Sequence, residues 1–106
     1  MKNLLFSFDD LGSKSDKALT KLKQFFTRAG TPVVTAEPSA KTMRSSGVSY
    51  RELYLTFGDS QRVTLRVKAT GDVYQVLLNE KLIPLKAQDD HVKAVAEISQ
   101  KLKDGS

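Results

Sequence analysis

The residues of this chain that could perform chemistry are few, and they lie near its two ends. Neighbouring carboxylates occur as Asp9-Asp10 and Asp89-Asp90, and His91, the single histidine, follows the second pair. Paired carboxylates can serve acid–base catalysis or bind a hard cation. Adjacent acids beside a helix start more commonly form the turn and interact with the helix dipole. We therefore expect structural roles for these acids and a partly packed surface position for His91.

The sequence lacks the other patterns on which enzyme chemistry depends. No serine or acid is spaced around the histidine as in a catalytic triad, and one histidine is too few for a zinc site without carboxylate ligands. The chain has no cysteine, which excludes disulfides and thiolate metal sites. Its six glycines stand alone, so no phosphate-binding loop is present. The sequence predicts a protein that is not an enzyme, with no catalytic residue, metal site, cofactor or evident small-molecule ligand.

Four basic residues lie along one flank of a predicted helix: Lys14, Lys17, Lys21 and Arg28. With an advance of about 100° per residue, they fall in one arc beside the apolar arc of that helix. A row of cations can bind an acidic partner such as the phosphates of a nucleic acid. The same row is also the ordinary solvated side of an amphipathic helix. Both interpretations stay open.

A second basic surface is predicted on the face of a sheet. Its members alternate with apolar residues along two predicted strands: Tyr50, Tyr54, Arg62, Arg66 and Lys68. Aromatic rings beside basic residues can stack bases and hold phosphates. The alternative is a plain solvated face, on which such residues are common, with Glu52 paired to Arg62 or Arg66 across the ladder.

Two amphipathic helices are expected to position these groups. The first, at about 14–29, is predicted to begin after Ser13 as N-cap, with Asp16 completing a capping box. Gly30 then ends this helix. The second, at about 90–103, is expected to be capped by Asp89 or Asp90. Its predicted inward stripe consists of Val92, Val95, Ala96, Ile98 and Leu102.

The remaining segments are expected to form strands and one long loop. Residues 1–8 alternate as a mostly buried strand, residues 9–12 are expected to form a turn, and residues 31–37 suit a short strand at a sheet edge because of Pro32. Residues 38–49 have no periodicity, which predicts an exposed, flexible loop. From Tyr50 the period becomes two, with turns at 58–60, 70–72 and 79–80. This pattern predicts an antiparallel β-meander over 50–85.

One architecture accommodates these elements economically. A one-sided sheet and two amphipathic helices predict a two-layer α+β sandwich, with a mostly antiparallel sheet and both helices on one face. With 106 residues, the chain has the size of one domain, 1–106. Its hydrophobic and charged fractions, 40% and 27%, are those of an ordered soluble protein. No apolar run suits a membrane span or a secretory signal, so we expect a cytoplasmic protein.

The resulting functional prediction is a small, non-enzymatic module that binds another macromolecule. We expect the partner to be another protein. The alternative is a nucleic-acid-binding accessory protein that uses the basic helix flank and the Tyr/Arg sheet face. An exposed apolar patch or strand edge would favour the protein partner. A positive surface formed by both basic features together would favour nucleic acid.

Overall fold

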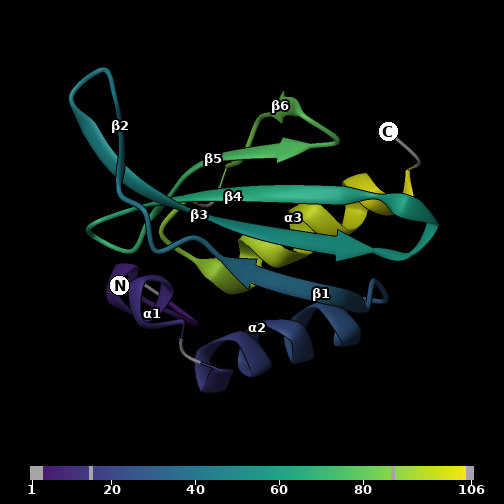
Figure 1. Cartoon of the computed structure of the whole chain (residues 1–106). Helices are drawn as coiled ribbons and strands as arrows, with labels where there is room; N and C mark the ends of the chain where they lie inside the picture. Colours follow the sequence, from purple (N-terminus) through teal and green to yellow (C-terminus); the bar gives the residue numbers. More distant parts are fainter. Residues whose placement is uncertain (1–3, 15, 87, 105–106) are drawn as a thin grey trace.

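The computed structural model describes residues 4–14, 16–86 and 88–104. Its elements follow in the order α1 (Phe8–Ser13), α2 (Asp16–Arg28), β1 (Val33–Pro38), β2 (Met43–Ser45), β3 (Val48–Phe57), the 3₁₀ turn η1 (Gly58–Ser60), β4 (Arg62–Lys68), β5 (Val73–Leu78), β6 (Lys81–Ile83) and α3 (His91–Lys103). The helices pack on a twisted antiparallel sheet (Figure 1). The predicted α+β architecture is confirmed.

The sheet is organised around β3. Within the described residues its strand order is β1-β3-β4-β5-β6, and β2 also pairs with β3. The first two strands lie along the same side of β3, because β1 pairs with residues 53–57 and β2 with residues 48–50. Strands β3 to β6 are sequential neighbours, which confirms the meander predicted from residue 50. The edge position predicted for the strand after Pro32 is also confirmed, since β1 lies at the end of the order.

One apolar core lies between the sheet and the helices. Alternate residues of the strands face it, together with one stripe from each of α2 and α3. This core includes Leu53, Leu55, Phe57, Val63, Leu65 and Val67 from the sheet, Leu19, Leu22 and Phe26 from α2, and Val95, Ile98 and Leu102 from α3. Both long helices therefore cover the same face, as predicted. The stripe of α3 differs slightly from expectation, because Ala96 is exposed and Ala94 is buried.

The N-terminal segment does not form the strand predicted for residues 1–8. Residues 1–3 lie outside the described part, and α1 begins at Phe8, so the predicted turn at 9–12 is wrong as well. The Ser7 hydroxyl accepts a hydrogen bond from the Asp10 backbone N–H at 3.0 Å, and the Asp10 carboxylate accepts one from the Ser7 N–H at 2.8 Å. This capping box satisfies donors of the first helical turn. The capping box of Ser7 and Asp10 therefore favours a helix from Phe8, and the short apolar alternation before it does not produce a strand.

The start of the second helix also differs from the prediction. Ser13 ends α1 instead of capping α2, and Lys14 adopts a left-handed conformation with φ of 55°. This conformation ends one helix and allows the chain to change direction before α2 begins at Asp16. The predicted end is correct, since α2 stops at Arg28 and Gly30 has a φ of 93°. For α3, the Asp90 carboxylate caps the helix by accepting from the Lys93 N–H at 3.1 Å.

The predicted loop at 38–49 contains a strand. β2 and the start of β3 form a hairpin that projects from one end of the sheet (Figure 1). Its two-residue turn is Ser46-Gly47, with φ values of 53° and 80°. Positive φ at both positions suits the twist of a tight hairpin. The long β3 offers backbone hydrogen-bonding groups with which β2 can pair. β2 can therefore form without a hydrophobic alternation in its own sequence. The flexibility of residues 38–49 stays a prediction.

His91 is buried, with 1% of its surface exposed, so the predicted surface position is wrong. Its Nδ1 accepts a hydrogen bond from the Leu5 N–H at 2.9 Å, and its Nε2 lies 2.8 Å from the Gly71 carbonyl oxygen. Since Nδ1 accepts, Nε2 carries the proton and donates to Gly71. The Phe6 ring packs at 4.5 Å from the imidazole. His91 therefore ties the N-terminal segment to the turn before β5.

We expect Leu65→Ala to lower the free energy of unfolding by about 2–5 kcal/mol, as truncation of a buried leucine does. Leu65 is 3% exposed and lies in the middle of the core. Phe25→Ala should cost less, because Phe25 is only partly buried and Arg28 covers its ring. Chemical denaturation monitored by circular dichroism measures both values. A near-zero change for Leu65→Ala would contradict the packing described here.

The stability of the protein should fall as the pH drops below about 6.5, the ordinary histidine pKa. Burial lowers the pKa of His91 despite the Gly71 carbonyl and the charges of Asp72 and Asp90, which act in the opposite direction. The unfolded chain therefore binds a proton at His91 more readily than the folded protein does. The contribution of neutral His91 to the free energy of unfolding is thus complete above pH 6.5 and is lost as the pH falls. Protonation would also place a proton on Nδ1. That atom would then be a donor facing the Leu5 N–H and could no longer accept its hydrogen bond.

Urea unfolding at pH 7.5 and 5.5 tests this dependence on the wild type and on His91→Asn. The variant should be less stable at pH 7.5 and should show a much smaller change between the two pH values. Because the chain has one histidine, no other imidazole can contribute. An equal change in stability between the two pH values in both proteins would contradict the role given to His91.

Candidate interaction surface

The face of the sheet opposite the helices is open in the described part of the chain. Cross-strand pairing places four of its residues side by side over four strands, and we call them the open-face row: Tyr54, Thr64, Leu77 and Leu82. Leu82 is 61% exposed and Tyr54 is 43% exposed, and the other two are partly exposed. The row thus combines aliphatic and aromatic surface on a rigid support.

A hydrogen-bonded cluster lies beside this row. The Glu52 carboxylate accepts from the Tyr54 hydroxyl at 2.7 Å and from Nε of Arg66 at 3.0 Å. Nη1 of Arg66 donates in turn to the Gln75 side-chain oxygen at 2.7 Å. We call these four residues the Glu52 cluster. The cross-strand pair that the sequence suggested as one alternative is therefore present between Glu52 and Arg66.

The cluster fixes the ionisation of Tyr54. Its hydrogen bond to Glu52 raises the pKa of the Tyr54 hydroxyl to about 12, and burial and the carboxylate charge act in the same direction. Loss of the proton would remove the bond and place two negative oxygens together. Tyr54 therefore stays a neutral hydrogen-bond donor, and its ring is held in one orientation on the open face.

Tyr50 does not occupy the exposed position that the alternation predicted. It is 5% exposed, with its ring 5.8 Å from that of Tyr74 and the Arg66 guanidinium 5.3 Å above it. A tyrosine at the sheet centre can lose its exposure to neighbouring long side chains, which the period-two pattern does not show. Three of the five residues predicted for this face, Tyr50, Tyr54 and Arg66, thus make internal contacts, and of these Tyr54 keeps an exposed ring.

The other two basic residues of the face lie apart from each other. Arg62 is exposed at the start of β4, and Lys68 is partly exposed at its end. They are six positions apart along the strand, which corresponds to about 20 Å. Arg66, neutralised by Glu52, lies between them. The face therefore has no continuous positive surface along β4.

The basic helix flank lies on the other side of the sheet. Lys17, Lys21 and Arg28 are exposed on α2, whereas Lys14 is the left-handed cap of α1 and belongs to neither helix. Because α2 covers the core face of the sheet, its cations point away from Arg62 and Lys68. The two basic features predicted from the sequence are not brought together.

Two hollows border the open-face row. One, of about 490 Å³, is lined by Tyr54, Arg62, Thr64, Asn79 and Glu80 among others. The second, of about 370 Å³, lies around Leu82 and is lined by Tyr74, Pro84, Leu85 and Gln88 among others. Leu77, Leu82 and Tyr74 were not identified from the sequence. Their alternation with the core residues of β5 and β6 is the signal that could have indicated them.

Both edges of the sheet are poor sites for adding a strand. The pairing of β1 with β3 is irregular between Val33 and Thr35, which leaves Val34 unpaired and 63% exposed. At the other edge, β6 has only three residues and Pro84 follows it. Bulges, short strands and prolines are the features that prevent edge-to-edge pairing. The faces of the molecule are therefore better suited to interactions than its edges.

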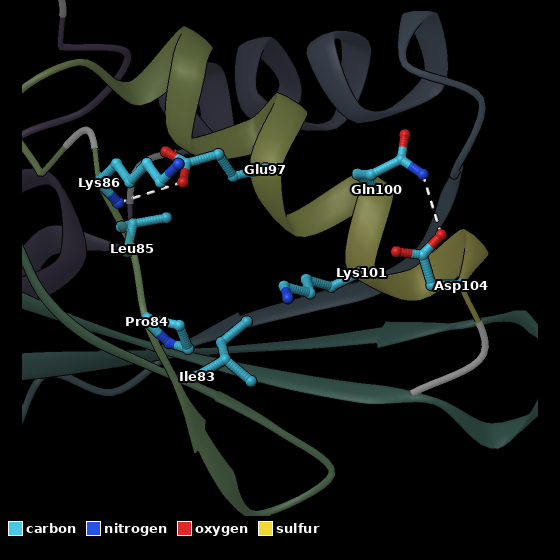
Figure 2. A pocket seen from close by; sticks show the side chains of 8 residues that line it. All are labelled: Ile83, Pro84, Leu85, Lys86, Glu97, Gln100, Lys101 and Asp104. Atoms are coloured by element: carbon cyan, nitrogen blue, oxygen red, sulfur yellow. Dashed lines mark hydrogen bonds between the residues drawn. The ribbon is translucent and has the colours of Figure 1, made fainter.

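A further groove lies between α3 and the segment that follows β6 (Figure 2). Ile83, Pro84 and Leu85 form one side, and Gln100 and Lys101 lie on the other side, in a volume of about 270 Å³. One hydrogen bond joins the two sides, since the Lys86 N–H donates to Glu97 of α3 at 3.1 Å, and within the α3 side Gln100 donates to Asp104 at 3.0 Å. In residues 4–14, 16–86 and 88–104, no three His, Cys, Asp or Glu side chains are grouped so that they could hold a metal ion. The described helices include none that is long and apolar enough to cross a membrane.

Glu52→Gln should lower the pKa of Tyr54 from about 12 toward the ordinary value near 10, because the negative charge beside the hydroxyl is removed. NMR titration of the tyrosine rings at alkaline pH measures this value. Glu37→Gln is the matched control: Glu37 lies opposite Tyr54 in the ladder but is not among the groups that shift its pKa. An unchanged Tyr54 pKa in Glu52→Gln would contradict the role given to this carboxylate.

Comparison with known proteins gives one match. No curated protein and no solved structure matches the chain. A family model, described as "Defence against restriction A N-terminal" (DarA_N), matches residues 6–106. This range includes every helix and strand described above, from α1 to α3. Because the match covers nearly all of its length, the chain belongs to the Defence against restriction A N-terminal family.

Proposed function

We propose that the chain is a small, non-enzymatic accessory module that binds another protein through the open-face row, and that its place of action is the cytoplasm. The family description supplies a context for the partner, since restriction is carried out by proteins. The partner that we propose is accordingly a restriction enzyme. A bound module could hinder the enzyme sterically without performing any reaction of its own.

The observation that carries this proposal is the exposure of apolar surface across an otherwise uncovered sheet face, from β3 to the edge strand β6. Leu82 at 61% and Tyr54 at 43% are among the most exposed large hydrophobic side chains of the described residues. Leu77 and Thr64 connect them across the strands. Contiguous apolar patches with a polar surround are typical of protein interaction sites.

The surroundings of the row suit a protein interface. The Glu52 cluster holds Tyr54 in place before any partner arrives, so little side-chain entropy is lost on binding. Arg62 and Glu80 line the neighbouring hollow and supply a rim with both charge signs. An aromatic anchor beside aliphatic groups and a polar rim is a common distribution in binding hot spots.

The proposal that the module performs no catalysis is supported by the positions of the groups that could have done so. Both ring nitrogens of His91 are engaged inside the protein. Asp10 belongs to the capping box of α1, and Asp90 caps α3. These side chains form hydrogen bonds with backbone groups and are not directed into a common cavity.

Leu82→Arg should weaken binding to the partner by about tenfold or more, because a charge would replace an apolar anchor. Val34→Arg is the matched control, since Val34 is equally exposed but lies on the opposite edge of the sheet. Calorimetric titration against a panel of purified restriction enzymes measures the affinities, and DNA cleavage in the same mixtures measures inhibition. Thermal unfolding of both variants checks that the fold is retained.

Two results would contradict the proposed function. In the first, the wild-type chain binds none of the enzymes and leaves cleavage unchanged. In the second, binding occurs but Leu82→Arg and Val34→Arg bind as the wild type does. The second result would show that the partner uses another surface.

A further inference from the structure

We propose that the outward surface of α2 and α3 binds the phosphate backbone of double-stranded nucleic acid. This helix-layer surface consists of Lys17, Lys21, Arg28, Lys93 and Lys103. It is separate from the open-face row, because the helices and the row lie on opposite faces of the sheet. The inference does not rest on the proposed function.

The two long helices carry a large share of the positive charge. Between them, α2 and α3 contain seven lysines and arginines against two acids, Asp16 and Glu97, which is an excess of five. The formal net charge of the whole chain is also +5. The charge of all remaining segments therefore sums to zero, and the imbalance that could attract a polyanion is located on the helix layer.

The cations of α2 form a line that faces away from the core. Lys17, Lys21 and Arg28 are all exposed, whereas the buried side chains Leu19 and Phe26 lie on the opposite side of the helix. Positions separated by four and seven residues repeat nearly the same direction at about 100° per residue. The acid of this helix, Asp16, is its first residue and lies off the line. No carboxylate of α2 therefore interrupts the row.

α3 extends this surface sideways. The side chain of Lys103 lies against Gly30, just beyond the end of α2, where its Cε and Nζ are 3.1 Å from the position that a Cβ would take. The hydroxyls of Thr31 and Ser99 are 2.6 Å apart and hold the same two segments together. Lys93 is exposed on the outer side of α3. Glu97, by contrast, is turned toward the segment that follows β6, where it accepts from the Lys86 N–H.

The density of charge favours a nucleic acid duplex as the occupant. The row from Lys17 to Arg28 is about 16 Å long at the rise of an α-helix. Over such a length a duplex presents about ten phosphates, one for roughly every 1.7 Å of its axis. Acidic protein surfaces rarely offer charges at this spacing without intervening cations. The arrangement of cations along a straight helix also fits the extended backbone of a duplex.

A duplex fits this surface better than a single strand does. Single strands are held mainly by aromatic rings on which unpaired bases stack. On the helix layer, Phe26 is buried, and Phe25 is partly buried with the Arg28 guanidinium 5.4 Å from its ring centre. The surface therefore offers cations without a stacking platform. We expect binding that depends on phosphates and has no sequence preference.

Fluorescence anisotropy with a short labelled duplex, titrated between about 50 and 200 mM salt, tests this inference. Five phosphate contacts predict a slope of log affinity against log salt of about −4.5. The double variant Lys17→Glu/Lys21→Glu should weaken binding about tenfold or more and reduce the slope by about two. Lys17→Gln/Lys21→Gln should reduce the slope similarly, with no reversed charge to repel the duplex.

The matched control is Arg62→Glu/Lys68→Glu, which changes the net charge by the same amount on the opposite face of the sheet. It should retain the slope and most of the affinity. Thermal unfolding of all variants verifies the fold, since the replaced α2 side chains are exposed. The restriction enzyme panel is measured separately, so a failure of protein binding and a failure of duplex binding are distinguished.

Several results would overturn the inference. The first is the absence of saturable binding at low salt. The second is an equal loss of duplex affinity in the helix-layer and control variants, which would indicate attraction by net charge alone. A preference for the single strand would assign binding to the tyrosines of the open face. Equally tight binding of poly-glutamate at the same salt would favour an acidic protein partner.

Discussion

The backbone ladder along β3 is the interaction on which most of the molecule depends. This strand of ten residues pairs with β1 and β2 on one side and with β4 on the other. Its alternation places Leu53 and Leu55 in the core and Glu52 and Tyr54 on the open face. Arg51 extends its influence to α1, since its guanidinium donates to the Phe8 carbonyl at 2.8 Å and lies 4.0 Å from the Phe8 ring.

The same strand explains why a charged group is tolerated at the centre of the sheet. Glu52 is buried, which would be costly for an isolated carboxylate. Its oxygens accept from Tyr54 and Arg66, and Arg66 is held further by Gln75 and by the ring of Tyr50. A fully bonded network of this kind rigidifies its surroundings. The exposed apolar groups next to it are therefore presented on a stiff surface, which is an advantage for binding.

The two faces of the protein have opposite chemical characters. Apolar and aromatic groups lie on the open face of the sheet beside the Arg66–Glu52 ion pair, and the helix layer carries the exposed cations of α2 and α3. A two-layer fold with one core necessarily has two outward surfaces, and here the sequence gives each a different composition. The proposed protein partner and the proposed duplex would accordingly contact the module from opposite sides and would not compete for the same residues.

The sequence by itself determined the elements whose signals are local. The period-two pattern from residue 50, the apolar stripes of α2 and α3, and the Gly30 and Asp90 boundaries each depend on neighbours in the chain. Only the tertiary structure decided what depends on distant partners: β2 exists because β3 offers a ladder, and His91 is buried because Leu5 and Gly71 lie on either side of its ring. Likewise, Tyr50 is covered by Tyr74 and Arg66, and the two basic surfaces are separated by the sheet. Local periodicity encodes the direction of a side chain but not which groups from other segments meet it, because those are set by how the layers pack.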